Sequence, residues 1–260
     1  IPYIKSLIWQ AYCQATEEAG LQGKSGILCD GTFGQHVLNQ ATGIKENNDS
    51  MVWIGRPIEQ PSSRPLMLEH GNIGSQLVNW PREHIVKCLV FYHPNDGQSL
   101  KLQQQRDLQD IYQACCQSGH ELLLEIILPK DSAPCSPEEE GQLYTSALSQ
   151  LYDLGIKPDW WKLPSIEQQG WKDIDALIEQ QDPYCRGIVL LGLDAPLDQL
   201  AKGFQDAAQS KNVQGFAVGR SIFGEPTKQW LKCEIDDETF ISKVKNNYHQ
   251  LVSVWQQRHS

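Results

Sequence analysis

Short apolar runs, separated by stretches of helical periodicity, recur along the whole chain and constrain its fold more than any other feature. Seven of these runs read as strands, at residues 26–30, 52–55, 85–92, 121–128, 159–163, 187–193 and 213–218. They follow one another about every 31 residues, which is the length of one strand–helix–strand unit. The sequence therefore predicts an α/β protein built on a parallel sheet.

The strands are apolar along their length, which is typical of a parallel sheet covered by helices. Helices are predicted at residues 98–117, 137–154, 198–208 and 237–255. Seven such strands without a change in composition favour one (β/α)8 TIM barrel. The alternative is a doubly wound sheet, but its glycine-rich first turn, G-x-G-x-x-G, is absent.

The beginning of the chain adds one expectation about its boundaries. Residues 2–20 already form an amphipathic helix, so the first strand of a complete barrel would lie upstream of Ile1. We therefore expect residues 1–260 to be a single barrel domain that is a fragment of a longer polypeptide.

Composition excludes several functional classes. The 260 residues carry a formal net charge of -10. The overall electrostatic field therefore repels nucleic acid, and an anionic small molecule would need a locally cationic pocket. The apolar runs are shorter than the roughly 18 residues that span a bilayer, which predicts no membrane association. The eight cysteines include no C-x-x-C pair and no zinc spacing, and they indicate a reducing, cytoplasmic location.

Three charged residues stand inside apolar strands, where a charge is costly unless it is paired. They are Lys87, Glu125 and Lys162. Burial lowers the pKa of a lysine, and a partly neutral lysine can attack a ketone to form an imine while a carboxylate moves the protons. We expect the three charged ends to meet in one barrel interior, with Lys87 deeper than Lys162.

A purely structural interpretation of the same residues is a buried ion-pair network that fills the barrel. Two lysines and one acid would leave a cationic excess, which favours an anionic ligand or a neutralised lysine over a simple pair. The spacing alone does not separate these interpretations.

A second group of residues follows the last two strands. Gly219 and Arg220 close the seventh strand, and Gly192 and Asp194 end the sixth. In TIM barrels the corresponding loops bind phosphate through backbone N–H groups, to which an arginine adds further donors. A surface arginine after a tight turn is the alternative.

Two further candidates end the first two strands. Asp30 would bind a sugar hydroxyl or balance the excess positive charge of the two lysines. The alternative is that Asp30 is a turn residue at the strand end. Arg56 would meet a substrate carboxylate, or it pairs with Glu59. His93 and Asp96 follow the third strand, and the sequence Pro-Asn-Asp-Gly that contains Asp96 is typical of a turn.

Several strings resemble the aldolase-type domain of bacterial inositol catabolism that often follows a 5-dehydro-2-deoxygluconokinase domain in one polypeptide. They are VKCLVFYHP, HELLLEIILP, PDWWKLP, GIVLLGLDAP and GFAVGRSIF. The likeness covers nearly the whole chain, and a more distant one links it to class I tagatose-bisphosphate aldolases.

In the tagatose-bisphosphate aldolases the strand-six lysine forms the imine, and this position falls on Lys162. The strand-four lysine falls on Lys87, the strand-five glutamate on Glu125, and the phosphate-binding glycine and arginine on Gly219 and Arg220. The family's first strand, which carries an active-site aspartate, is expected to lie upstream of Ile1.

The resemblance implies a lyase of carbohydrate metabolism that cleaves 2-deoxy-5-keto-gluconate 6-phosphate to dihydroxyacetone phosphate and malonate semialdehyde. It also implies a fused kinase domain. No metal or other cofactor is expected, because the imine replaces it as the electrophile. The competing hypothesis is a non-catalytic phosphosugar-binding barrel that senses ligand for the kinase. A homo-oligomeric state is left open by the sequence.

Overall fold

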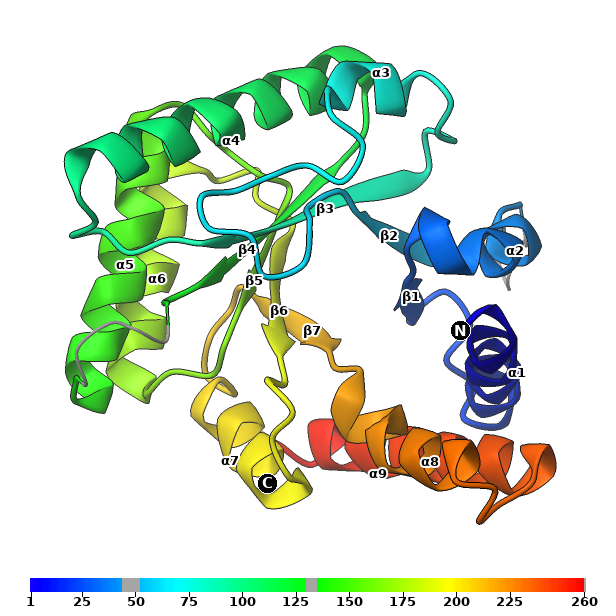
Figure 1. The fold of residues 1–260 in the computed structure, drawn as a ribbon. Coiled ribbons are helices and arrows are strands. Elements are labelled where there is room, and N and C mark those ends of the chain that lie inside the picture. The colour runs from blue at the N-terminus through cyan, green and yellow to red at the C-terminus, as the bar shows by residue number, and fades with distance from the viewer. Residues whose placement is uncertain (44–51, 130–134, 260) are drawn as a thin grey trace. The chain divides into compact units, whose positions relative to one another are not determined.

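The fold comes from a computed structural model, which describes residues 1–43, 52–129 and 135–259. The seven strands are β1 (Gly26–Leu28), β2 (Trp53–Pro57), β3 (His84–Phe91), β4 (Leu122–Ile127), β5 (Trp160–Leu163), β6 (Gly187–Leu191) and β7 (Val213–Ala217). Their order in the sheet is their order in the chain (Figure 1). The pairs β1–β2, β3–β4, β4–β5 and β5–β6 are parallel. All seven predicted strands are therefore confirmed, with small differences at their ends.

The helices alternate with these strands. They are α1 (Pro2–Glu18), α2 (Gly31–Ala41), α3 (Ile73–Leu77), α4 (Gln98–Ser118), α5 (Pro137–Asp153), α6 (Gln168–Gln181), α7 (Leu197–Asp206), α8 (Arg220–Leu231) and α9 (Asp237–Gln256). The sequence interpretation gave no bounds for α6, although Glu167 marks its start by accepting hydrogen bonds from the N–H groups of Gln169 and Gly170. By contrast, α5 has clear start signals, since Pro137 occupies its first turn and Ser136 and Glu139 form a capping box.

The chain forms two compact units. The first unit comprises Ile1–Arg56, Gly192–Gln205 and Ala217–Ser260. The second comprises Pro57–Leu191 and Asp206–Phe216. In the first unit, α1 packs on α2 and α9, and α8 packs on α9. Trp9, Cys29, Leu38 and Ile54 form part of its buried core.

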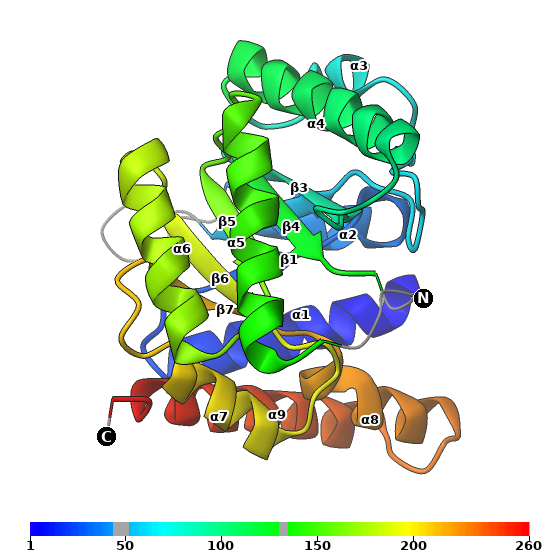
Figure 2. The ribbon, with the colours of Figure 1, turned by 90° about the vertical axis from the view of Figure 1, so that its left-hand side faces the viewer.

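The second unit contains β3 to β6 and their covering helices. Helices α5 and α6 lie side by side against one face of these strands (Figures 1 and 2). The side chains on that face are buried, and those that are at most 1% exposed include Val86, Cys88, Leu124, Trp161 and Leu163. Because side chains alternate along a strand, the residues between them point to the opposite face. That opposite face carries the charged residues that the sequence singled out.

Two glycines allow α5 and α6 to approach closely. A Cβ added to Gly141 would lie 3.1 Å from the Cα of Gly170. We expect Gly141→Ala to lower the free energy of unfolding by about 1–3 kcal/mol, because the helices would have to separate. Chemical denaturation measures this change. Gly224→Ala in α8 is the control, since its Cβ would meet only the Arg220 Cβ at 3.8 Å and it should be neutral or stabilising. Equal effects of the two substitutions would contradict the close-approach explanation.

Candidate active site

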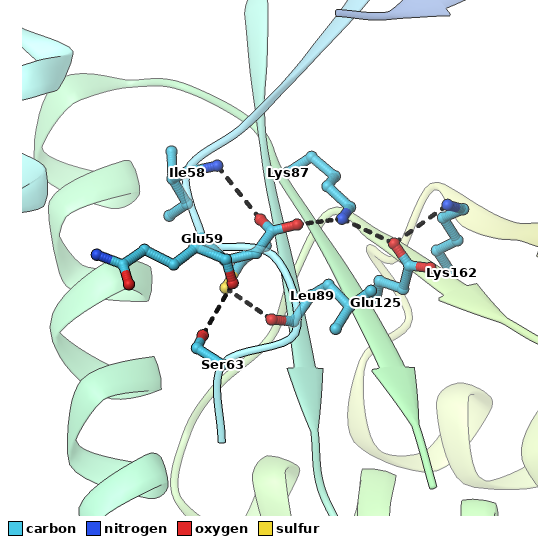
Figure 3. Close-up of polar contacts among 9 residues, drawn as sticks. Ile58, Glu59, Ser63, Lys87, Leu89, Glu125 and Lys162 are labelled. Atoms are coloured by element: carbon cyan, nitrogen blue, oxygen red, sulfur yellow. Dashed lines mark hydrogen bonds and ion pairs between the residues drawn. The ribbon is translucent and has the colours of Figure 1, made fainter. Parts of the chain in front are cut away.

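Lys87, Glu125 and Lys162 come from the adjacent strands β3, β4 and β5 and point to one face of the sheet (Figure 3). The parallel register sets Leu89, Glu125 and Lys162 side by side. Lys87 lies two positions before Leu89 and therefore on the same face. Regular strand pairing is thus enough to bring the three charged side chains together.

One carboxylate oxygen joins the two lysines. The Oε2 atom of Glu125 lies 2.9 Å from Nζ of Lys87 and 3.1 Å from Nζ of Lys162. Both lysines are 7% exposed and Glu125 is 4% exposed. The expectation that these groups meet within hydrogen-bond distance is confirmed.

The structure adds a fourth member that the sequence interpretation did not place here. Glu59 lies just beyond β2, is 9% exposed, and forms an ion pair through Oε1 with Nζ of Lys87 (Figure 3). Glu59, Lys87, Glu125 and Lys162 together are called the lysine–glutamate cluster below. The predicted cationic excess is wrong, because two lysines and two glutamates cancel in formal charge. The sequence signal that could have found Glu59 is its position two residues after the end of β2. The sequence interpretation considers Glu59 only as a partner of Arg56.

The pKa values of the two lysines are shifted in opposite directions. Burial alone would lower the pKa of Lys87, but the carboxylates of Glu125 and Glu59 hold it above its ordinary value. Burial lowers the pKa of Lys162, and the nearby charge of Lys87 lowers it further against the attraction of Glu125. The same two ammonium groups keep the pKa of Glu125 below its ordinary value although burial would raise it. The cluster therefore holds one firmly cationic lysine and one lysine that deprotonates more readily.

Depth separates the lysines as expected. Lys87 pairs in register with Leu123, whereas Lys162 pairs with Glu125, two residues further along β4. Lys87 thus starts one layer closer to the amino ends of the strands, and its long side chain reaches up to Glu125. Lys162 lies near the carboxyl ends, where active sites of such barrels form.

Asp30 and Arg56 belong to the first unit. Asp30 is the N-cap of α2: it accepts a hydrogen bond of 2.7 Å from the Phe33 N–H, and it forms an ion pair with Lys5. The guanidinium of Arg56 borders the same turn, 2.9 Å from where a Cβ on Gly31 would lie. Asp30 therefore has the turn role that was one of its two alternatives. Its role toward a ligand stays a prediction, as does that of Arg56.

Gly192, Asp194, Gly219 and Arg220 also lie in the first unit, where the loop after β6 contacts the start of α8. Arg220 is 3.7 Å from a carboxylate oxygen of Asp194, and both side chains are more than half exposed. The Ser221 hydroxyl donates to the Ala195 carbonyl at 2.8 Å. Gly219 is the N-cap of α8 and gives it no side-chain cap. The structure thus brings these four residues together, while phosphate binding there stays a prediction.

His93 and Asp96 form the turn that their sequence indicated. The Asp96 N–H donates to the His93 carbonyl at 3.0 Å, and the Asp96 carboxylate accepts from the His93 N–H at 3.2 Å. Asp96 also forms an ion pair with Arg64. These contacts give both residues a structural role.

Within residues 1–43, 52–129 and 135–259, no group of three or more His, Cys, Asp or Glu side chains is arranged to hold a metal ion. No helix in this part of the chain has the length and apolar character needed to cross a membrane.

Comparison with protein families gives one match over residues 1–259, to the family described as "Uncharacterized protein conserved in bacteria (DUF2090)". The chain belongs to the DUF2090 family. A search of curated proteins finds no match to this DUF2090 sequence.

Solved structures similar to this DUF2090 protein include Cgl0159 from Corynebacterium glutamicum, with a TM-score of 0.55 and 15% identity over 94% of this chain and 76% of that one. An archaeal fructose 1,6-bisphosphate aldolase gives a TM-score of 0.53 and 13% identity over 96% and 82% of the two chains. A further archaeal fructose-1,6-bisphosphate aldolase structure has its catalytic lysine covalently bound to the carbinolamine intermediate of the substrate. It gives a TM-score of 0.53 and 12% identity over 92% of this chain and 82% of that one. At these identities the likeness shows the fold alone, and it confirms the predicted TIM barrel.

Proposed function

We propose that this DUF2090 protein is a class I aldolase, a carbon–carbon lyase that forms a Schiff base through Lys162. The observation that carries the proposal is a buried lysine whose pKa is lowered beside a second, cationic lysine, with one carboxylate between them. A neutral amine attacks a ketone, and the protonated imine then withdraws electrons from the bond to be broken. The fold shared with Schiff-base aldolases supports this assignment.

The substrate that we propose is a phosphorylated keto-sugar acid, 2-deoxy-5-keto-gluconate 6-phosphate, which the sequence resemblance implies. Lys162 would add to the C5 ketone and release water. Glu125, assisted by Lys87, would take the proton from the C3 hydroxyl while the C3–C4 electrons move into the enamine. Malonate semialdehyde leaves, and protonation and hydrolysis of the enamine release dihydroxyacetone phosphate and restore the Lys162 amine.

The residues proposed to bind the substrate are those that the sequence singled out at the strand ends. Gly192, Gly219 and Arg220 would bind the phosphate through backbone N–H groups and the guanidinium. Asp30 and Arg56 would bind hydroxyl and carboxylate groups.

Condensation in the reverse direction tests the proposed function. The protein is incubated with dihydroxyacetone phosphate and malonate semialdehyde, and the six-carbon product is detected by mass spectrometry. Product that requires the protein supports an aldolase. Tight binding of dihydroxyacetone phosphate without product or covalent adduct would contradict it and favour the phosphosugar-binding alternative.

Replacing Arg220 separates phosphate recognition from the chemistry. We expect Arg220→Ala to weaken binding of dihydroxyacetone phosphate by about 10- to 100-fold, because a charge-assisted contact to the phosphate is lost. Binding of dihydroxyacetone should change little. Isothermal titration of both ligands measures the difference, with Arg186→Ala as a control because Arg186 pairs with Glu121 in the second unit. Equal losses for both ligands would exclude Arg220 as a phosphate contact.

A further inference from the structure

The two lysines of the lysine–glutamate cluster are equivalent in several respects that control amine reactivity. Each is 7% exposed, and each lies about one hydrogen-bond length from the same Glu125 oxygen, at 2.9 Å for Lys87 and 3.1 Å for Lys162. Burial and the shared carboxylate therefore do not explain why one lysine would react and the other would not.

Glu59 breaks this equivalence. Its Oε1 atom pairs with Lys87, so that Lys87 lies between two carboxylates. The ion pair that the structure shows for Lys162 is with Glu125 (Figure 3). The order of charges across the cluster is thus Glu59, Lys87, Glu125, Lys162, with Lys162 at one end.

The backbone around Glu59 fixes it in this position. The Ile58 N–H donates to the Lys87 carbonyl at 3.1 Å, which attaches the segment to β3. Residues 58–69 then fold back on themselves, with the Glu69 N–H donating to the Ile58 carbonyl and the Gln60 N–H to the Met67 carbonyl, each at 2.8 Å. An ion pair from Arg64 to Asp96 ties this hairpin to the turn after β3. The Glu59 carboxylate is therefore held beside Lys87 by structure on both sides of it.

We propose that Glu59 selects the reactive lysine of the cluster: by giving Lys87 a second carboxylate it keeps that amine protonated and leaves Lys162 as the amine that combines with carbonyl compounds. Glu59 acts through Lys87 and is a positioning residue. This inference rests on the proposed function, because selection of one lysine matters to a Schiff-base enzyme, which needs one defined nucleophile.

The titration of the neighbouring groups agrees with this role. Glu125 and Glu59 raise the pKa of Lys87, and Glu59 also hydrogen-bonds to it. The pKa of Lys162 is lowered by burial and by Lys87, although Glu125 and, more weakly, Glu59 act in the opposite direction. Burial raises the pKa of Cys88, next to Lys87 on the opposite face, well above its ordinary value. Replacing Glu59 by glutamine should therefore bring the two lysines closer together in pKa.

Reductive methylation with formaldehyde and cyanoborohydride tests the proposal without any assumption about substrate. Formaldehyde reacts with neutral amines, and peptide mapping by mass spectrometry gives the rate at each lysine as a function of pH. In the wild-type protein Lys162 should be modified at least about tenfold faster than Lys87 near neutral pH, because each pKa unit changes the neutral fraction about tenfold. In Glu59→Gln the Lys87 profile should move to lower pH by about one unit or more, and Lys87 should become a competing site.

Two variants make the result specific. Glu69→Gln makes the same change on the same hairpin, where Glu69 lies 3.9 Å from the exposed His70, and it should leave both profiles unchanged. Glu59→Asp keeps the charge and should retain most of the selectivity for Lys162. If Glu59→Asp behaves like Glu59→Gln, or if the Lys87 profile does not move in Glu59→Gln, the proposal is overturned.

Even if Glu59→Gln fails to fold, the wild-type profile can overturn the proposal, because equal reactivity of Lys87 and Lys162 would contradict selection by Glu59, and Glu59→Asp against Glu69→Gln then carries the comparison. Failure of the aldolase proposal would look different. In that case methylation would still favour Lys162, while no condensation product or sugar adduct would form.

Discussion

Lys162→Ala is expected to abolish covalent trapping of dihydroxyacetone phosphate by borohydride and to reduce carbon–carbon cleavage by about 10⁴-fold or more. The reason is that the imine is both the covalent intermediate and the electron sink, so no neighbouring group can replace it. Intact-protein mass spectrometry measures the trapped adduct, and the release of dihydroxyacetone phosphate measures turnover.

Two further variants define what this loss means. Lys172→Ala removes an exposed lysine from α6 and should trap as the wild type does. Lys87→Ala should slow trapping but leave the adduct on Lys162, since Lys87 contributes the positive charge that lowers the pKa of Lys162 rather than the bond to substrate. Trapping that survives in Lys162→Ala, or that is lost in Lys172→Ala, would be inconsistent with Lys162 as the nucleophile.

Glu125→Gln is expected to have the second largest effect because it removes the carboxylate that joins both lysines. Cleavage should fall by about 10²- to 10⁴-fold, the usual contribution of a general base, while imine formation on Lys162 continues. Loss of trapping and cleavage in equal measure would instead assign Glu125 a role in forming the imine. Single-turnover trapping compared with steady-state cleavage separates the two outcomes.

The same substitution should also cost stability. Removing one partner of a buried ion pair leaves charge uncompensated, so we expect a loss of about 3–5 kcal/mol in the free energy of unfolding. Glu179→Gln is the matched control, since Glu179 and its partner Lys211 are both more than half exposed and should contribute about 1 kcal/mol or less.

The acid dependence of stability checks the sign of the Glu125 titration. Its pKa is below the ordinary value of 4.5 in the folded protein, so its contribution is fully present above pH 4.5 and is lost as the pH falls through the folded pKa. The wild type should therefore lose stability with acid more steeply than Glu125→Gln. Parallel acid profiles would mean that Glu125 is not stabilised by the two lysines.

Much of the fold was accessible from sequence because the parallel sheet leaves a strong local pattern. The run around Cys88 and that around Trp161 are apolar because one face of each strand is fully buried. A charged residue inside such a run must point to the other face, which is why Lys87, Glu125 and Lys162 could be placed together. Their near-contact follows from parallel pairing in register.

Glu59 was missed for the opposite physical reason. It lies outside any apolar run, and its contact with Lys87 depends on how residues 58–69 fold back and attach to β3. Such tertiary contacts leave no periodic signal. The sequence interpretation therefore gave the cluster the wrong charge balance, while the assignment of Lys162 over Lys87 as the reactive lysine stays a prediction.

The measurement that most directly tests the account is the location of the borohydride-fixed adduct in the wild-type protein. The protein is incubated with dihydroxyacetone phosphate, reduced, digested and mapped by tandem mass spectrometry. The account predicts a single adduct on Lys162, formed faster as the pH rises toward the lowered pKa of that amine. An adduct on Lys87, or the absence of any adduct under conditions in which dihydroxyacetone phosphate is bound, would contradict it.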